Sequence, residues 1–271
     1  MRIVCWNMAH SRKAWDALVE MDAVDIALLQ EASRLPDDLR HRVDVDDKLW
    51  DDHRLWPGRE DAALGYPSVV ARLSERVSTS FIATGPMADA FSHDFYTSEW
   101  GTLGAAIVSP IDEDESLIVV SMAPYSNAFT RESGSPSRRE PIGSLHRLIS
   151  DLSRLVGRQS RVIAAGDWAI HPGWSTYPTP IWNEREALHF QTAFDRMRAL
   201  GFRKVNLKGR HGNRGNVVTF QSMVETPAQA WAQADYVFAT ENIADRVWAR
   251  ALNSPDDWGP SDHCRIVIDL A

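Results

Sequence analysis

Three compact polar residues, Ser261, Asp262 and His263, directly precede an apolar run near the end of the chain. The run continues to Ile268 and has the composition of a strand. A carboxylate and an imidazole at the mouth of a strand can converge on one reacting atom. An Asp-His pair alone is weak evidence of a site, because two such residues also meet by chance in loops.

Four further segments have the same form, in which an apolar run places a polar residue at or near one end. They are residues 3–7, 25–31, 162–168 and 234–238, and the polar residues that they deliver are Asn7, Glu31, Asp167 and Asp235. Alone, such residues are interpreted as turn amides or solvated strand caps. The repetition of one pattern favours a shared site instead. Carboxylate oxygens are the ligands that Mg²⁺ and Mn²⁺ prefer.

Strands must position these residues, and the apolar pattern predicts them from one end of the chain to the other. Predicted strands are 2–6, 25–30, 68–72, 77–83, 104–109, 117–122, 162–165, 217–220, 235–239, 246–250 and 265–269. Helical spacing predicts three helices: one that Ser11 caps, one over residues 141–156, and one that opens with an Asn183–Glu186 capping box and runs to Gly201. Two sheets packed face to face with helices outside suit this order.

The order and spacing of the five segments resemble the endonuclease/exonuclease/phosphatase superfamily, the DNase I-like metal-dependent phosphoesterases. The resemblance extends from Arg2 to Leu270. It implies an α/β fold with four layers, an α/β/β/α sandwich of two packed, mostly antiparallel sheets with outer helices. The site would then lie at one edge of the sandwich.

The resemblance also implies a metal site. Glu31 would be the principal ligand of Mg²⁺ or Mn²⁺, with Asn7 beside it and Asp262 near the metal. Phosphodiester hydrolysis needs such a cation to neutralise charge on the phosphoryl oxygens, together with an activated water and help for the leaving oxygen.

Three catalytic roles follow from the same resemblance. Asp167, at a sharp turn after Gly166, would position or deprotonate the attacking water. Asp235 would orient His263, and His263 would contact the scissile phosphate as a cation or proton donor. A histidine between carboxylates has its protonated form favoured, which suits a phosphate partner.

Two positions depart from the family pattern. Ala169 stands where the family has asparagine, so one hydrogen bond to water or phosphate is lost. We interpret this isolated change as a deliberate substitution that traps substrate or silences a nuclease, in preference to natural divergence. The strand at 118–122 usually delivers a His or Tyr; here Tyr125 arrives late and either fills that role by a local shift or leaves it empty.

Two flanking regions are candidates for substrate contact. Lys208, Arg210 and Arg214 lie among glycines, in a stretch without an acidic residue from Arg203 to Val224. This stretch either grips a phosphate backbone or forms a solvated hairpin tip. Trp174 follows the Asp167 turn and either stacks on bases or packs, and packing is favoured because the chain has 11 tryptophans.

Composition sets further bounds. A content of 44% hydrophobic and 24% charged residues is typical of a globular protein. At 271 residues two domains are possible, but the site segments span both ends and favour a single domain, 1–271. Cys5 and Cys264 lie in apolar runs and are expected to be buried, reduced thiols. Seven aspartates between positions 37 and 52 are interpreted as a solvated face rather than a cation-binding loop.

The net charge of −8 argues against nonspecific coating of nucleic acid. It does not exclude a nuclease, because a cation bound by carboxylates supplies the positive charge that faces phosphate. The sequence has no apolar run near the length of a membrane span and no signal peptide, so we expect a cytoplasmic protein without a membrane segment.

We therefore predict a Mg²⁺-dependent phosphodiesterase and, within that class, a nuclease that hydrolyses DNA or RNA, in a form impaired at Ala169. One alternative keeps the chemistry and changes the substrate to a phosphoinositide, sphingomyelin or a small nucleotide. The other is a nucleic-acid-binding protein of the same fold that hydrolyses little. The sequence leaves the choice of DNA or RNA, endo- or exo-action and the oligomeric state open.

Overall fold

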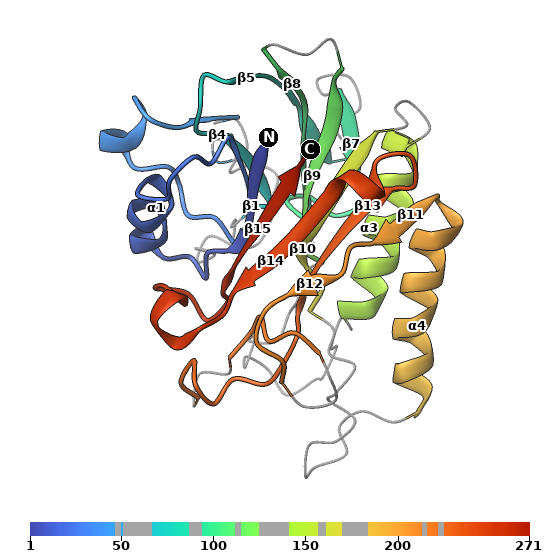
Figure 1. Ribbon diagram of the computed structural model, residues 1–271. Helices are drawn as coiled ribbons and strands as arrows, with labels where there is room; N and C mark the ends of the chain where they lie inside the picture. The colour runs from blue at the N-terminus through green and yellow to red at the C-terminus, as the bar shows by residue number, and fades with distance from the viewer. Residues whose placement is uncertain are drawn as a thin grey trace, which may run out of the picture.

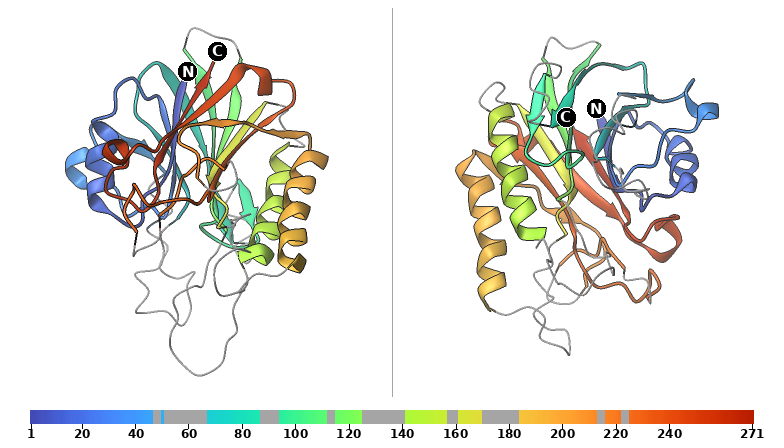
Figure 2. Two further views of the ribbon diagram at one scale, coloured as in Figure 1. Left: turned by 60° about the horizontal axis from the view of Figure 1, so that its bottom comes forward. Right: turned by 180° about the vertical axis from the view of Figure 1, so that it is seen from behind.

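Two β-sheets pack face to face, with helices outside, in the structure of this protein, a computed structural model (Figures 1 and 2). The structure describes residues 1–46, 50, 67–86, 94–111, 115–124, 141–156, 161–169, 184–212, 216–221 and 225–271. Helices α3 and α4 lie outside one sheet, and α1 lies outside the other (Figure 2). The predicted four-layer sandwich is confirmed.

The first sheet, sheet A, contains seven strands among the described residues. In spatial order they are β12 (Leu207–Lys208), β14 (Val247–Leu252), β15 (Arg265–Leu270), β1 (Arg2–Asn7), β2 (Ile26–Gln30), β4 (Val69–Arg72) and β3 (Asp44–Val45). Strands β1 and β2 are parallel, so Asn7 lies opposite Gln30 and both strands end together. Strand β15 runs antiparallel to β1, so its beginning meets the end of β1.

The second sheet, sheet B, contains six strands in the described part of the chain. They are β11 (Phe202–Lys204), β13 (Asp235–Thr240), β10 (Val162–Asp167), β9 (Leu117–Met122), β8 (Leu103–Pro110) and β5 (Val77–Ile82). Strand β13 is antiparallel to β10, which places Asp235 opposite Asp167. Most pairs in the two sheets are antiparallel, as predicted; β1–β2, β9–β10 and β12–β14 are parallel.

In the described parts of the chain, the helices with given bounds are α1 (Arg12–Val19), α3 (Pro141–Val156) and α4 (Glu184–Ala199), with short 3₁₀ turns η1 (Asp37–Leu39), η6 (Ala244–Arg246) and η7 (Pro255–Asp257). The 141–156 prediction is confirmed. Helix α1 begins after Ser11, but the Ser11 side chain makes no capping hydrogen bond, contrary to the expectation. The capping box at 183–186 lies outside the described residues and side chains.

Alternation along each strand divides the apolar side chains of the described residues among three cores. Ile3 and Cys5 face the space between the sheets, whereas Val4 packs on the α1 side. In β10, Ile163 faces the same inter-sheet core and Ala164 packs towards α3 and α4. Both faces of the central strands are therefore buried, which is why their sequences read as nearly continuous apolar runs.

Several short elements have no counterpart among the predicted ones. Strands β6 (Thr84–Pro86) and β7 (Phe95–Thr97) form a separate parallel pair, and β3, β11 and β12 have only two or three residues each. A strand of two or three residues is too short to show an alternation of apolar and polar residues in the sequence. The pairing of such strands therefore depends on the neighbouring strands. The predicted strand 217–220 is present only as isolated bridges at Val217 and Phe220.

Candidate active site

The polar ends of the five segments meet at one edge of the sandwich, opposite the two chain termini (Figure 1). Sheet A brings Asn7, Glu31 and the 261–263 segment to this edge, and sheet B brings Asp167 and Asp235. Parallel and antiparallel neighbours both contribute, because the ends of β1, β2 and β10 meet the beginnings of β13 and β15.

Asp167 is the residue on which the two sheets converge. Its Oδ2 accepts a hydrogen bond from Asn7 Nδ2 at 3.1 Å, and its Oδ1 accepts one from the Ala169 amide at 2.7 Å. His263 Nε2 lies 3.7 Å from Asp167 Oδ2, which is within ion-pair range but too long for a direct hydrogen bond. Burial raises the pKa of Asp167, and the nearby His263 opposes that rise.

Asp235 and His263 form a buried pair that joins the sheets. His263 Nδ1 and Asp235 Oδ2 are 2.8 Å apart. Burial alone would lower the pKa of His263, but the charges of Asp235 and Asp167 prevail and raise it. The Thr219 hydroxyl accepts a hydrogen bond from the backbone amide of Asp235 at 3.1 Å. This bond helps to fix the position of Asp235 at the beginning of β13. The Phe220 ring packs on the imidazole, with centroids 4.9 Å apart.

Glu31 lies beside this pair, directly after β2. Burial, and then the charge of Asp167, raises the pKa of Glu31 to about 7. Its backbone has φ +48°, in the left-handed region that non-glycine residues rarely adopt. His10 Nε2 lies 3.0 Å from Glu31 Oε2. Neither the sequence motif nor the resemblance pointed to His10, although it follows Asn7 by only three positions.

Ser261 ties the last segment to the first. Its hydroxyl donates to the Asn7 carbonyl at 2.7 Å and accepts the His263 amide at 3.1 Å. Trp6 Nε1 donates to the His263 carbonyl at 2.9 Å. These bonds hold the half-buried Asp262 at the mouth of β15, next to the ends of β1 and β2.

The donor set fits a divalent cation. Four carboxylates, those of Glu31, Asp167, Asp235 and Asp262, surround His263, and burial disfavours leaving their negative charge unbalanced. Oxygen donors of this kind suit a hard divalent ion. Within the described residues, the ligand atoms of Asp167, Asp235 and His263 lie within 4.8 Å of one another. This group differs from the predicted set of Glu31, Asn7 and Asp262.

Solved structures provide the comparison that decides the fold. The chain aligns over 99% of its length with 87% of an AP endonuclease from Leishmania major, at a TM-score of 0.67 and 16% identity. It aligns over 100% of its length with 99% of a Neisseria 3′ phosphatase bound to a product DNA hairpin, at 0.61 and 17%. An endonuclease/exonuclease/phosphatase from Bacteroides vulgatus gives 0.59 and 13%, over 100% of this chain and 98% of the other.

The chain has the DNase I-like fold. No protein-family model and no curated protein matches the sequence. At 13–17% identity these likenesses concern the fold. The chemistry of this DNase I-like chain therefore has to be argued from its own side chains. The described part of the chain contains no helix of the length and apolarity that a membrane span requires.

Other predicted residues have different environments on the DNase I-like scaffold. Tyr125, Trp174 and Arg214 lie outside the described residues. Lys208 is exposed on the edge strand β12. Ala169 is half-buried beside Asp167, with φ +48°.

Arg210 was predicted either to contact a phosphate backbone or to lie in a solvated hairpin tip, and its hydrogen bonds differ from both interpretations. Its guanidinium donates to the backbone carbonyls of Asn253 at 3.2 Å and Ala230 at 3.2 Å, and also to those of Pro227 and Ala228. The buried side chain of Asn253 accepts a hydrogen bond from the Arg210 backbone amide and donates one to the Arg210 carbonyl. A guanidinium that donates to several carbonyls in this way holds residues 210, 227–230 and 253 together, and it is not directed at a phosphate.

The cysteines and three of the aspartates between positions 37 and 52 match the expectations, whereas Asp47, Asp51 and Asp52 lie outside the described residues. Asp37, Asp38 and Asp44 are exposed and form ion pairs with arginines. Cys5 and Cys264 are buried free thiols.

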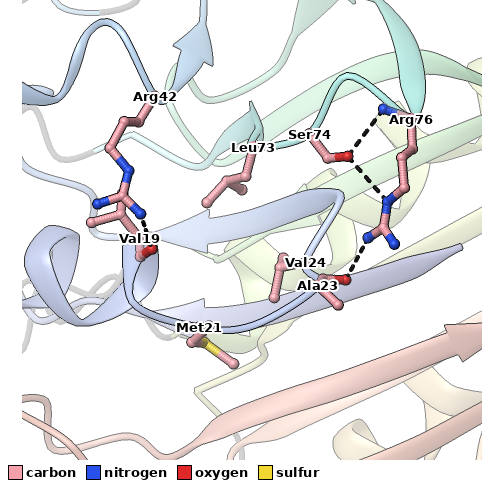
Figure 3. A pocket seen from close by; sticks show the side chains of 8 residues that line it. All are labelled: Val19, Met21, Ala23, Val24, Arg42, Leu73, Ser74 and Arg76. Atoms are coloured by element: carbon pink, nitrogen blue, oxygen red, sulfur yellow. Dashed lines mark hydrogen bonds between the residues drawn. The ribbon is translucent and has the colours of Figure 1, made fainter.

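A separate hollow of about 310 Å³ lies at the opposite end of β2 (Figure 3). Its two arginines already have partners. Arg42 donates to the Val19 carbonyl at 2.6 Å, and Arg76 pairs with the buried Asp25 at 2.8 Å. The arginines therefore secure the connections at this end of the sandwich, and the residues that line the hollow include none of the predicted site residues.

Proposed function

We propose that this protein is a metal-dependent phosphodiesterase and, within that class, a nuclease that hydrolyses DNA or RNA. The observation that carries the proposal is the position of Asp167. This carboxylate receives hydrogen bonds from Asn7 and from the Ala169 amide, and it faces His263 Nε2 across 3.7 Å. A base and a cationic donor on one side of the site can bind a water molecule and a phosphoryl oxygen that lie next to each other.

Each residue then has a chemical task. Asp167 accepts the proton of the attacking water, and its raised pKa suits a base that works near neutral pH. His263 is protonated because its pKa is raised, and it directs Nε2–H towards the phosphoryl oxygen. Asp235 accepts the Nδ1–H at 2.8 Å and so fixes the orientation of the ring.

Glu31, with Asn7 and Asp262, would hold the divalent cation at the adjoining strand ends. When bound, the cation neutralises charge on the phosphoryl oxygens. Asn7 serves two neighbours at once, since its side chain contacts both Asp167 and Glu31. It therefore connects Glu31, the proposed ligand of the cation, to Asp167, the proposed base for the attacking water.

The alanine at position 169 indicates that this protein hydrolyses its substrate slowly. Its backbone amide contacts Asp167, but its methyl group offers no donor to the phosphoryl oxygen or to water. Loss of one preorganised donor at a transition state lowers the rate by roughly a hundred- to a thousandfold. The protein is accordingly expected to bind metal and substrate and to turn over slowly.

The test is hydrolysis of labelled single- and double-stranded DNA and RNA, with and without Mg²⁺ or Mn²⁺. We expect slow, metal-dependent cleavage that Asp167→Asn removes. Short nucleotides, a phosphoinositide and sphingomyelin in the same assay separate the substrate classes. Absence of metal-dependent hydrolysis of all these substrates, in both the original chain and Ala169→Asn, would contradict the proposal.

A second candidate, a nucleic-acid-binding protein of the same fold that hydrolyses little, is favoured by the missing side-chain donor at Ala169. Equilibrium binding to the same oligonucleotides distinguishes it. Tight binding together with no turnover in Ala169→Asn supports this candidate, because restoring the carboxamide should restore catalysis if the remaining groups are competent.

A further inference from the structure

The proposed mechanism gives His10 no role, although this residue contacts Glu31, the proposed principal ligand of the cation. Its Nε2 is 3.0 Å from Glu31 Oε2, and its backbone amide donates to the Glu31 carbonyl at 3.1 Å. The imidazole is partly exposed, at 42%, so it borders the open side of the site. His10 and Glu31 are thus joined through both backbone and side chain.

The backbone around this contact adopts a rare conformation that a hydrogen bond from Ala9 to Asn7 stabilises. Ala9 has φ +45°, His10 has +61° and Glu31 has +48°. Non-glycine residues rarely enter this region, although histidine enters it more readily than most. The turn is held by the Ala9 amide, which donates to Asn7 Oδ1 at 2.9 Å. Unusual backbone conformations that are held in this way cluster at functional sites.

The distance between the two side-chain atoms is compatible with a shared ion. Adjacent ligands of an octahedral ion with bonds of about 2.1 Å are about 3.0 Å apart. The same spacing accommodates a hydrogen bond in the metal-free protein. A proton between two ligand atoms is released when a cation takes its place, as happens at protein metal sites in general.

We propose that His10 is a nitrogen ligand of the divalent cation held by Glu31, and that it biases the site towards Mn²⁺ over Mg²⁺. The inference rests on the proposed function, because it requires the cation to bind at Glu31. Carboxylate and amide oxygens serve both ions, whereas imidazole nitrogen is a ligand that first-row transition ions accept and Mg²⁺ avoids. His10 therefore determines which cation the site prefers.

The first experiment is calorimetric titration of the original chain with Mn²⁺ and with Mg²⁺, beside His10→Gly. Glycine removes the imidazole and tolerates φ +61°, so the turn keeps its shape. We expect the Mn²⁺ affinity to fall on the order of ten- to a hundredfold, since even groups outside the ligand shell contribute about that much. The Mg²⁺ affinity should change far less.

His41→Ala is the matched control, because His41 is exposed beside Arg42 at the opposite end of the sandwich. It should alter neither affinity. A second variant, His10→Asn, retains a residue that favours positive φ. It should lose the Mn²⁺ preference while the Mg²⁺ affinity reports that the fold is intact. Equal loss of both ions in His10→Gly and His10→Asn would overturn the assignment of His10 as the selective ligand.

The second experiment identifies the nitrogen directly by pulsed electron paramagnetic resonance of the Mn²⁺-loaded protein. A coordinated imidazole gives a nitrogen coupling, which should disappear in His10→Gly and persist in His263→Gln. The opposite pattern would place the ion on the Asp167–Asp235–His263 group and overturn the proposal for His10 alone. If neither ion binds the original chain, the proposed metal-dependent function fails as well.

Discussion

At the scale of single residues, position 169 keeps a backbone conformation that suits asparagine better than alanine. Ala169 has φ +48°, and its amide donates to Asp167 Oδ1 at 2.7 Å. Asparagine tolerates the left-handed region, which costs other L-residues roughly 1–2 kcal/mol. The turn around Asp167 thus has the shape that a carboxamide would favour, although the side chain is a methyl group.

Ala169→Asn is therefore expected to act on rate and stability together. Hydrolysis should rise by roughly a hundred- to a thousandfold, because the added donor serves the transition state. Substrate affinity should change little. The free energy of unfolding should rise by up to about 1 kcal/mol, because asparagine is favoured at positive φ. Single-turnover hydrolysis and urea denaturation measure the two effects.

Ala23→Asn provides the control, because Ala23 also has a positive φ of +57° but lies by the distant hollow. It should raise stability in the same way and leave hydrolysis unchanged. An unchanged rate in Ala169→Asn on every nucleic acid and phosphoester tried would favour the binding-protein candidate.

The Asp235–His263 pair should behave as one unit. The two side chains are buried and 2.8 Å apart, so the imidazole loses its orientation when the carboxylate is removed. In the Ala169→Asn background, the double variant Asp235→Asn/His263→Ala should be about as slow as the slower single variant. Comparing kcat/KM for the four proteins tests this, at a temperature where circular dichroism shows each to be folded. Losses that multiply would mean that the residues act independently.

At the scale of elements, the described segments around residues 210, 218 and 227–230 are joined by a clamp that we define as Arg210 and Asn253. The Asn253 side chain donates to the Arg210 and Val218 carbonyls at 2.9 and 2.7 Å. Val218 precedes Thr219, whose hydroxyl accepts the Asp235 amide. The clamp therefore supports, from outside the candidate site, the segment whose Thr219 hydroxyl accepts the Asp235 amide.

Arg210→Gln should destabilise the fold without changing the salt dependence of nucleic-acid binding. Loss of hydrogen bonds from a charged group to partly buried carbonyls is expected to reduce the free energy of unfolding by about 1.5–3 kcal/mol. The exposed Lys208 is the matched control, and Lys208→Gln should change stability by less than about 0.5 kcal/mol. Urea denaturation and binding at several salt concentrations measure both quantities. A weaker salt dependence of binding in Arg210→Gln would instead mean that Arg210 contacts substrate phosphates.

At the scale of the whole molecule, the site depends on how the two sheets are held together. Sheet A supplies His263 and sheet B supplies Asp235, so the pair exists only at the correct separation. Directly beneath the site, Gln30 Nε2 donates to Ser121 Oγ at 2.8 Å, and Ser121 donates to the Leu29 carbonyl at 2.7 Å. Gln30 and Ser121 are completely buried and connect β2 to β9.

Ser121→Ala should therefore weaken the contact between the sheets. It leaves the Gln30 amide and the Leu29 carbonyl without this partner, at an expected cost of about 1–3 kcal/mol in the free energy of unfolding. Ser78→Ala removes an exposed hydroxyl from the edge strand β5 and should cost less than about 0.5 kcal/mol. Urea denaturation of both variants tests the difference. Equal, small effects would show that apolar packing alone sets the separation of the sheets.

The sequence determined those features that depend on short-range pattern. Apolar runs with polar ends predicted the central strands, because a strand buried on both faces can hardly tolerate polar side chains before its end. Helical spacing predicted α3 over residues 141–156. The resemblance then selected four layers, which propensity had left open. The side chains of Asn7, Asp167, Asp235 and His263 lie together in the structure, and the roles that the resemblance implies for them stay predictions.

Only the tertiary structure decided the features that depend on the meeting of distant backbone segments. Arg210 turned inward because carbonyls of residues 227–230 and 253 converge on its guanidinium. His10 reached Glu31 because two successive left-handed residues turn the chain across the end of β2. Neither outcome is present in local propensity, since a turn conformation and its long-range partners are selected together when the sheets pack.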